Sequence, residues 1–158
     1  MSLLFRALVL VAALVSAAPA LAQSQYVEFS DTLPDATPAR TIAIDRVVGT
    51  GPEAVREQYV VIDYEGWVYD LAAPARKGAK IDSTKDRGYP LSVMAGLNRM
   101  ITGFDRAILG MRVGGKRTLV VPPRLGYGNR EAYGVIPPNS TLIFDVELLD
   151  VVPQQNVR

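Results

Sequence analysis

The side chains that could do chemistry in this sequence form a restricted set. The chain contains no histidine and no cysteine, which excludes Ser-His and Cys-His nucleophilic catalysis and the usual zinc sites. Carboxylates, phenols, lysines and arginines remain. The one pairing that resembles a nucleophile beside a base is Ser83 next to Asp82, so hydrolytic chemistry stays open on composition. We expect no metal ion and no cofactor.

A long loop is the second region with chemical potential. Residues 124–139 combine glycines and prolines with Tyr127 and Tyr133. Loops of more than about 12 residues inside a compact domain are usually functional. The aromatic and apolar content of this loop therefore predicts more than a linker.

These side chains need elements that position them, and the clearest is one short amphipathic helix within residues 97–111. Its apolar residues recur at three- and four-residue intervals, so they form one stripe that must be buried. They are Met100, Ile101, Phe104, Ile108 and Met111. We expect Asn98 to cap the start of the helix, Gly110 to end it, and Asp105 to lie off the stripe.

Most of the remaining chain reads as strand and turn. Strands are predicted at 41–48, 58–69, 81–93 with a bulge near Pro90, 117–121 and 141–151. Residues 71–80 are expected as an exposed loop, and the basic residues Arg112, Lys116 and Arg117 as a solvated cluster. The pattern predicts an α+β domain in which a single helix lies across an antiparallel sheet.

The N-terminal residues differ in kind. Residues 1–22 carry Arg6, an apolar run and an Ala-Leu-Ala end, which predicts a secretory signal peptide and, as the alternative, a membrane anchor. Its removal takes away one basic and no acidic residue, so the net charge of +1 becomes zero. We therefore expect an exported, periplasmic protein with no nucleic-acid partner and no membrane contact in its mature form. Residues 23–40 are expected as a flexible lead-in and 153–158 as a tail.

Six segments together resemble, in order and spacing, the FKBP-type peptidyl-prolyl cis-trans isomerases. They are Val61–Gly66, Ile81–Thr84, Met100–Phe104, Val113–Gly115, Leu125–Gly128 and Ile136–Leu148. The resemblance implies that residues 41–152 form a bent antiparallel β-sheet wrapped around one short α-helix, with a shallow apolar pocket between them.

The resemblance also implies which residues act in that pocket. The floor is expected at Phe104, which would bind the proline ring together with Tyr64 and Phe144. The Ile101 amide and the Tyr127 hydroxyl would hold the substrate backbone by hydrogen bonds.

The rim and walls of the pocket follow from the same resemblance. Asp82 would sit at the rim, oriented by Tyr64 and Arg87. The walls would be Ile81, Leu91, Met100 and Ile136. The family often has Trp at the Phe104 position, aromatic residues at Ile81 and Leu91, and His or another polar residue at Ala132, so a wider and less aromatic pocket is expected here.

The function implied is acceleration of X-Pro bond rotation during the folding of exported proteins. Partners would be proline-containing unfolded or partly folded polypeptides, with macrolide inhibitors as further ligands. A binding module or chaperone with little turnover is the alternative. The resemblance also implies a monomer, because family members that dimerise often carry a long helical N-terminal region, whereas here about 18 residues lie between the predicted signal peptide and the first expected strand.

Overall fold

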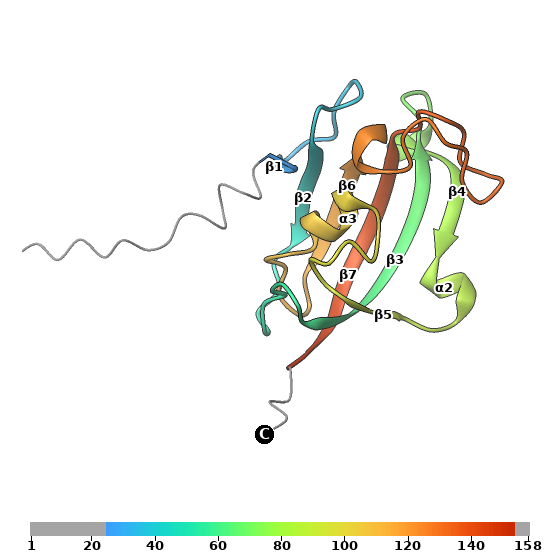
Figure 1. Cartoon of the computed structure of the whole chain (residues 1–158). Coiled ribbons are helices and arrows are strands. Elements are labelled where there is room, and N and C mark those ends of the chain that lie inside the picture. The colour runs from blue at the N-terminus through green and yellow to red at the C-terminus, as the bar shows by residue number, and fades with distance from the viewer. Residues whose placement is uncertain (1–24, 154–158) are drawn as a thin grey trace, which may run out of the picture.

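The computed structural model describes residues 25–153 and shows one sheet of seven strands with a short helix on one face (Figure 1). The strands are β1 Val27–Phe29, β2 Thr41–Val47, β3 Tyr59–Tyr69, β4 Lys77–Ser83, β5 Leu91–Met94, β6 Lys116–Val121 and β7 Leu142–Val152. Their order is β1-β2-β6-β7-β3-β4, and β5 also pairs with β3. All pairs are antiparallel except β1 with β2. The expected α+β class is confirmed.

The long strand β3 lies at the centre and pairs on both edges. One edge follows β7, while the other pairs first with β5 and then with β4. The single bulged strand predicted over residues 81–93 is wrong, because the helical turn α2 Thr84–Arg87 separates β4 from β5. The Ser83 hydroxyl caps this turn by accepting from the Lys85 amide at 3.1 Å, and Gly88 ends it at φ +81°.

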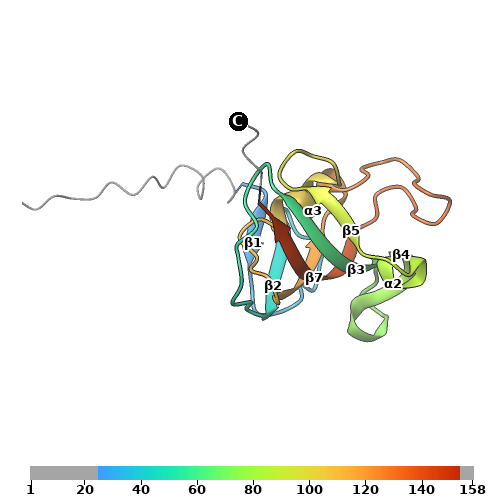
Figure 2. The same ribbon diagram turned by 90° about the horizontal axis from the view of Figure 1, so that it is seen from below.

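The segment predicted as an exposed loop is partly regular. Residues 74–76 form the 3₁₀ turn η1 Pro74–Arg76, and residues 77–80 belong to β4. A second such turn, η2 Pro123–Leu125, follows β6 and begins the long loop. Figures 1 and 2 place that loop on the side of the sheet that carries β4, away from β1.

The helix α3 Thr102–Ala107 is shorter than the sequence predicted. Phe104, Ile108 and Met111 are buried in the main core, as the stripe required. Gly103 lets α3 approach β2 and β6, because a Cβ there would lie 2.4 Å from the Thr41 hydroxyl oxygen.

The predicted ends of that helix are wrong. Asn98 has a left-handed backbone at φ 54° and lies outside the helix, so it does not cap it, and Ile108 stands at the C-terminal cap in place of Gly110. Asp105 was expected off the stripe but is fully buried, where its carboxylate accepts from the amides of Gly96 and Asn98 at 2.9 and 2.8 Å. The Asp105 side chain of α3 thus holds the turn that precedes the helix.

Arg117 is not part of a solvated cluster. Only 5% of the residue is exposed, and its guanidinium donates to Asp45 at 2.6 Å and to the Ala107 carbonyl at 2.6 Å. It therefore ties β2 and β6 to the end of α3, where a positive charge also suits the helix dipole.

The segment expected as a flexible lead-in packs against the sheet. Residues 27–29 form β1, with Val27 buried, and Leu33 packs on the outer face. The Tyr69 hydroxyl donates to the Pro34 carbonyl across that face. The predicted signal peptide at 1–22 lies outside the described residues, and within residues 25–153 no helix is long and apolar enough to cross a membrane.

Candidate functional site

A hollow of about 580 Å³ lies between α3, the β3–β4–β5 side of the sheet and the long loop. All eleven residues named from the family resemblance line this hollow. Their roles in binding and catalysis stay predictions. They are Tyr64, Ile81, Asp82, Arg87, Leu91, Met100, Ile101, Phe104, Tyr127, Ile136 and Phe144. Arg99, Tyr133 and Val135 complete the lining.

Three aromatic rings form the floor. The rings of Phe104 and Phe144 meet edge to face with centroids 5.1 Å apart, and Tyr64 lies 5.6 Å from Phe104 and 6.4 Å from Phe144. Gly66 makes room for this arrangement, because a Cβ there would come within 2.6 Å of the Phe144 ring. Phe104 comes from α3 and the other two from neighbouring strands, so the floor exists only in the folded sheet.

The rim carries a linked set of polar groups. The Tyr64 hydroxyl donates to Asp82, and Arg87 donates to the same hydroxyl at 2.8 Å. Arg87 also lies 3.6 Å from the Asp82 carboxylate. Burial first, and then the neighbouring Asp82, raise the pKa of Tyr64 to about 12, although Arg87 opposes the shift. Tyr64 therefore stays a neutral donor at ordinary pH.

The long loop closes the opposite side of the hollow. Tyr127 and Tyr133 meet edge to face with centroids 5.7 Å apart, and a short bridge joins Ala132 to Ile136. Burial, followed by the Tyr133 hydroxyl, raises the pKa of Tyr127. Tyr127 thus stays neutral at ordinary pH and lines the hollow. Ala132 itself does not line the hollow.

A backbone donor lies at the start of α3. Ile101 occupies the N-terminal cap position, and its amide makes no hydrogen bond to another residue in the described range 25–153. The first amides of a helix lack partners within the helix. Because Ile101 lines the hollow, its amide is a candidate donor to the carbonyl of a bound chain.

The arrangement does not fit covalent catalysis. Ser83, the nucleophile candidate beside Asp82, is 1% exposed and caps α2. Its amide, not its hydroxyl, contacts the Asp82 carboxylate, at 2.8 Å. Within residues 25–153 there is no group of three or more side chains of the kinds that ligate metals. What the hollow offers is apolar ring contact with a few hydrogen-bond donors at its edge.

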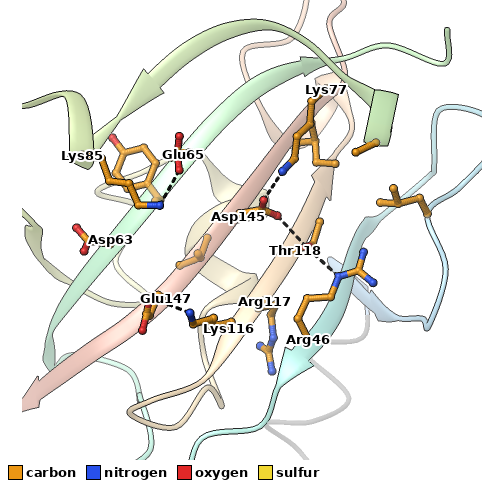
Figure 3. A pocket seen from close by; sticks show the side chains of 15 residues that line it. Arg46, Asp63, Glu65, Lys77, Lys85, Lys116, Arg117, Thr118, Asp145 and Glu147 are labelled. Atoms are coloured by element: carbon orange, nitrogen blue, oxygen red, sulfur yellow. Dashed lines mark hydrogen bonds and ion pairs between the residues drawn. The ribbon is translucent and has the colours of Figure 1, made fainter. Parts of the chain in front are cut away.

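A second hollow, of about 340 Å³, lies on the outer face of the sheet (Figure 3). Most of its charges are paired with one another. Asp145 accepts from the Thr118 hydroxyl at 2.8 Å and pairs with Lys77, while Lys85 pairs with Glu65 at 2.8 Å. The pairing lowers the pKa of Glu65 and raises that of Lys85. These groups already satisfy one another, so this hollow is no candidate for the chemistry.

Three lining residues were missed from the sequence. Arg99 was placed on a helix that begins only at Thr102, Tyr133 was noted in the loop without a site role, and Val135 carried no signal. Tyr133 has a positive φ of 53°, a backbone conformation that is uncommon outside glycine. The paired tyrosines of the loop were the one signal that could have found Tyr133.

Comparison with known proteins gives a consistent result. Residues 51–149 match the FKBP-type peptidyl-prolyl cis-trans isomerase family. The chain is similar to the FK506-binding protein of Neisseria meningitidis serogroup A, with 46% identity over 103 residues that cover 65% of this chain and 88% of the relative. It is similar to FK506-binding protein 1B of Neurospora crassa, with 47% identity over 105 residues that cover 66% and 92%.

Two crystal structures are similar over most of the described residues. AtFKBP13 superposes with a TM-score of 0.63 and 37% identity, covering 75% of this chain and 98% of that one. FkpA from Escherichia coli gives a TM-score of 0.63 and 37% identity, covering 73% of this chain and 50% of FkpA.

Proposed function

Because this chain belongs to the FKBP-type peptidyl-prolyl cis-trans isomerase family, we propose that it accelerates X-Pro bond rotation without any covalent step. Its substrates are proline-containing unfolded or partly folded polypeptides. The observation that carries the proposal is the three-ring floor of Phe104, Tyr64 and Phe144 under a mouth with only a few hydrogen-bond donors.

The physical task is to weaken amide resonance. Rotation about the C–N bond costs about 18 to 20 kcal/mol because it breaks the partial double bond. The planar amide has more charge separation than the twisted one, whose carbonyl has lost conjugation. An apolar floor therefore disfavours the planar ground state more than the transition state, and this difference lowers the barrier.

The lining residues divide this work. Phe104, Tyr64 and Phe144 bind the proline ring, and burying such a ring contributes roughly 1.5 to 3 kcal/mol. The Ile101 amide and the Tyr127 hydroxyl hold the substrate backbone, at about 1 kcal/mol net for each hydrogen bond. These hydrogen bonds keep the substrate backbone on one side of the X-Pro bond fixed while the other side rotates.

Asp82 and Arg87 shape the rim. They fix the Tyr64 hydroxyl from two sides, so that the ring keeps its edge-to-face contact with Phe104. The walls at Ile81, Leu91, Met100 and Ile136 exclude water from the floor. Macrolide inhibitors are proposed as further ligands of the same hollow.

A protease-coupled assay on Ala-Xaa-Pro-Phe peptides tests the proposal. We expect acceleration by the purified chain, a fall of about 10- to 100-fold in kcat/KM in Phe104→Ala, and a fall of about fivefold in Tyr127→Phe. Phe104→Leu is the matched control for folding, because it keeps most of the buried volume. Peptides that bind but rotate at their spontaneous rate would contradict an enzyme and favour a binding module or chaperone.

We further propose that the protein is exported and assists folding outside the cytoplasm, with the periplasm as its compartment. The apolar run and Ala-Leu-Ala end of residues 1–22 support this. Uncatalysed X-Pro steps take about 10 to 100 s, slow enough to limit folding there. Mass spectrometry of the secreted form should find Gln23 as its first residue. Ultracentrifugation should give a monomer mass.

A further inference from the structure

Arg99 is the charged residue of the hollow that the isomerase proposal leaves without a role. It lines the hollow next to Met100 and Ile101, and its side chain is exposed. The other arginine in the lining, Arg87, is engaged by Tyr64 and Asp82. Arg99 makes no side-chain hydrogen bond and no ion pair with any residue in the range 25–153 that the structure describes. It is therefore a cation held at the mouth without a counter-charge.

The backbone around Arg99 is fixed rather than free. The buried carboxylate of Asp105 accepts from the Gly96 amide at 2.9 Å and from the Asn98 amide at 2.8 Å. Gly96 and Asn98 both have positive φ, of 78° and 54°. This turn sets the base of the Arg99 side chain two residues before the Ile101 amide, the donor proposed to hold the substrate backbone.

The charges of the lining do not cancel. Of its fourteen residues, Arg87 and Arg99 are basic and Asp82 alone is acidic. Asp82 already receives the Tyr64 hydroxyl and lies 3.6 Å from Arg87. The mouth thus has one positive charge in excess, and it is carried by Arg99.

We propose that Arg99 is a specificity-determining residue that favours substrates with a carboxylate side chain on a residue next to the proline. The proposal rests on the isomerase function proposed above. A guanidinium presents paired N–H donors that match a carboxylate. No acceptor within residues 25–153 pairs with Arg99, which precedes by two residues the Ile101 amide that would hold the substrate chain.

The expected size of the preference follows from the exposure of Arg99. An ion pair at an exposed site contributes little and is screened by salt, so about a two- to fivefold advantage in kcat/KM is expected at low salt. The advantage should shrink as ionic strength rises, because the screening length falls to about 8 Å near 0.15 M.

The test compares matched peptides that differ at one residue. Three Ala-Xaa-Pro-Phe peptides carry Glu, Gln or Lys before the proline, and a second set carries the same residues after it. Because the second set lacks the protease site, exchange between cis and trans forms is followed by NMR. The variants are Arg99→Gln and Arg99→Glu. Arg130→Gln is the matched control, because Arg130 is an exposed arginine of the loop that does not line the hollow.

We expect the Glu peptide to exceed the Lys peptide by about two- to fivefold in at least one set. The ratio should approach one in Arg99→Gln, invert in Arg99→Glu and stay unchanged in Arg130→Gln. Normal turnover of the Gln peptides with a ratio near one in both sets, or an unchanged ratio in Arg99→Gln, overturns this inference alone. No turnover of any peptide overturns the proposed function and this inference with it.

Discussion

The two faces of the sheet carry hollows of opposite character. The hollow under α3 is floored by three rings that touch one another edge to face, and its mouth has one unpaired charge. The outer hollow is lined by acids and bases that pair across strands (Figure 3). A ligand of the outer hollow would have to displace ion pairs, whereas the three-ring floor of the inner hollow contains no ion pair.

Open volume alone does not mark a site. Both hollows have room for a small ligand, but the polar groups of the outer hollow already make hydrogen bonds and ion pairs with one another. We therefore expect changes in the outer hollow to alter stability and changes in the inner hollow to alter the rate.

Gly66→Ala should give the largest effect, because its new Cβ meets the Phe144 ring at 2.6 Å and the Ile81 side chain at 3.2 Å. Forcing a methyl group into a packed site costs about 1 to 3 kcal/mol, and the ring shift should lower kcat/KM as well. Thermal unfolding and the peptide assay measure the two effects.

A second variant tests the cause of that loss. Adding Phe144→Leu removes the ring atoms that clash with the new methyl group. The double variant should therefore lose less unfolding free energy than the sum of the losses in Gly66→Ala and Phe144→Leu. Strict additivity would show that Gly66 acts through the backbone of β3 and not through the ring.

Alkaline pH should act on stability before it acts on chemistry. The pKa of Tyr64 is raised from 10.0 to about 12, so its contribution is fully present below pH 10 and is lost as the pH rises from 10 through about 12. With no histidine or cysteine in the chain, kcat/KM should be flat between about pH 6 and about pH 9. A bell-shaped profile in that range would contradict a mechanism without proton transfer.

Asp145→Asn should change stability and leave the rate unchanged. It keeps an acceptor for the Thr118 hydroxyl and removes the ion pair with Lys77. Because both side chains are partly exposed, the loss is about 0.5 to 1 kcal/mol and should diminish at high salt. Chemical denaturation and the peptide assay, run on the same preparation, give both numbers. A large fall in rate would show that the outer face contributes to catalysis.

Tyr133→Ala should give the smallest effect, confined to the rate. The ring is 81% exposed and touches Tyr127, so its removal should lower kcat/KM by about twofold without changing stability. Tyr133→Phe is the control that keeps the ring and removes the hydroxyl. A loss equal to that of Tyr127→Phe would mean that the two tyrosines act as one donor.

The sequence predicted the elements whose information is local. The alternation in 58–69 and 141–151 identified β3 and β7, and the spacing of Phe104, Ile108 and Met111 identified the buried face of α3. Linked motifs then located all eleven lining residues that were named. The motif pattern is thus enough to predict where these residues lie, although their roles stay predictions.

The features that were missed depend on partners far away in the chain. Arg117 is buried because Asp45, 72 residues earlier, pairs with it. Asp105 is buried because two amides before the helix point at it. The residues next to a charged residue in the sequence do not reveal such a partner, so the charged residue is predicted to be exposed to solvent. The place of Arg99 at the mouth escaped for another reason, because the sequence put it on a helix that begins only at Thr102.

Strand β1 has a practical consequence for how the domain is joined to anything else. Its parallel pairing with β2 fixes the incoming chain at Val27, on the edge farthest in strand order from β4, which carries Ile81 and Asp82 (Figure 2). A fusion partner, surface linker or affinity tag added ahead of Val27 is therefore attached at the opposite border from the three-ring hollow. An N-terminally immobilised domain should leave the hollow open, whereas one tethered through the loop at 126–139 should not.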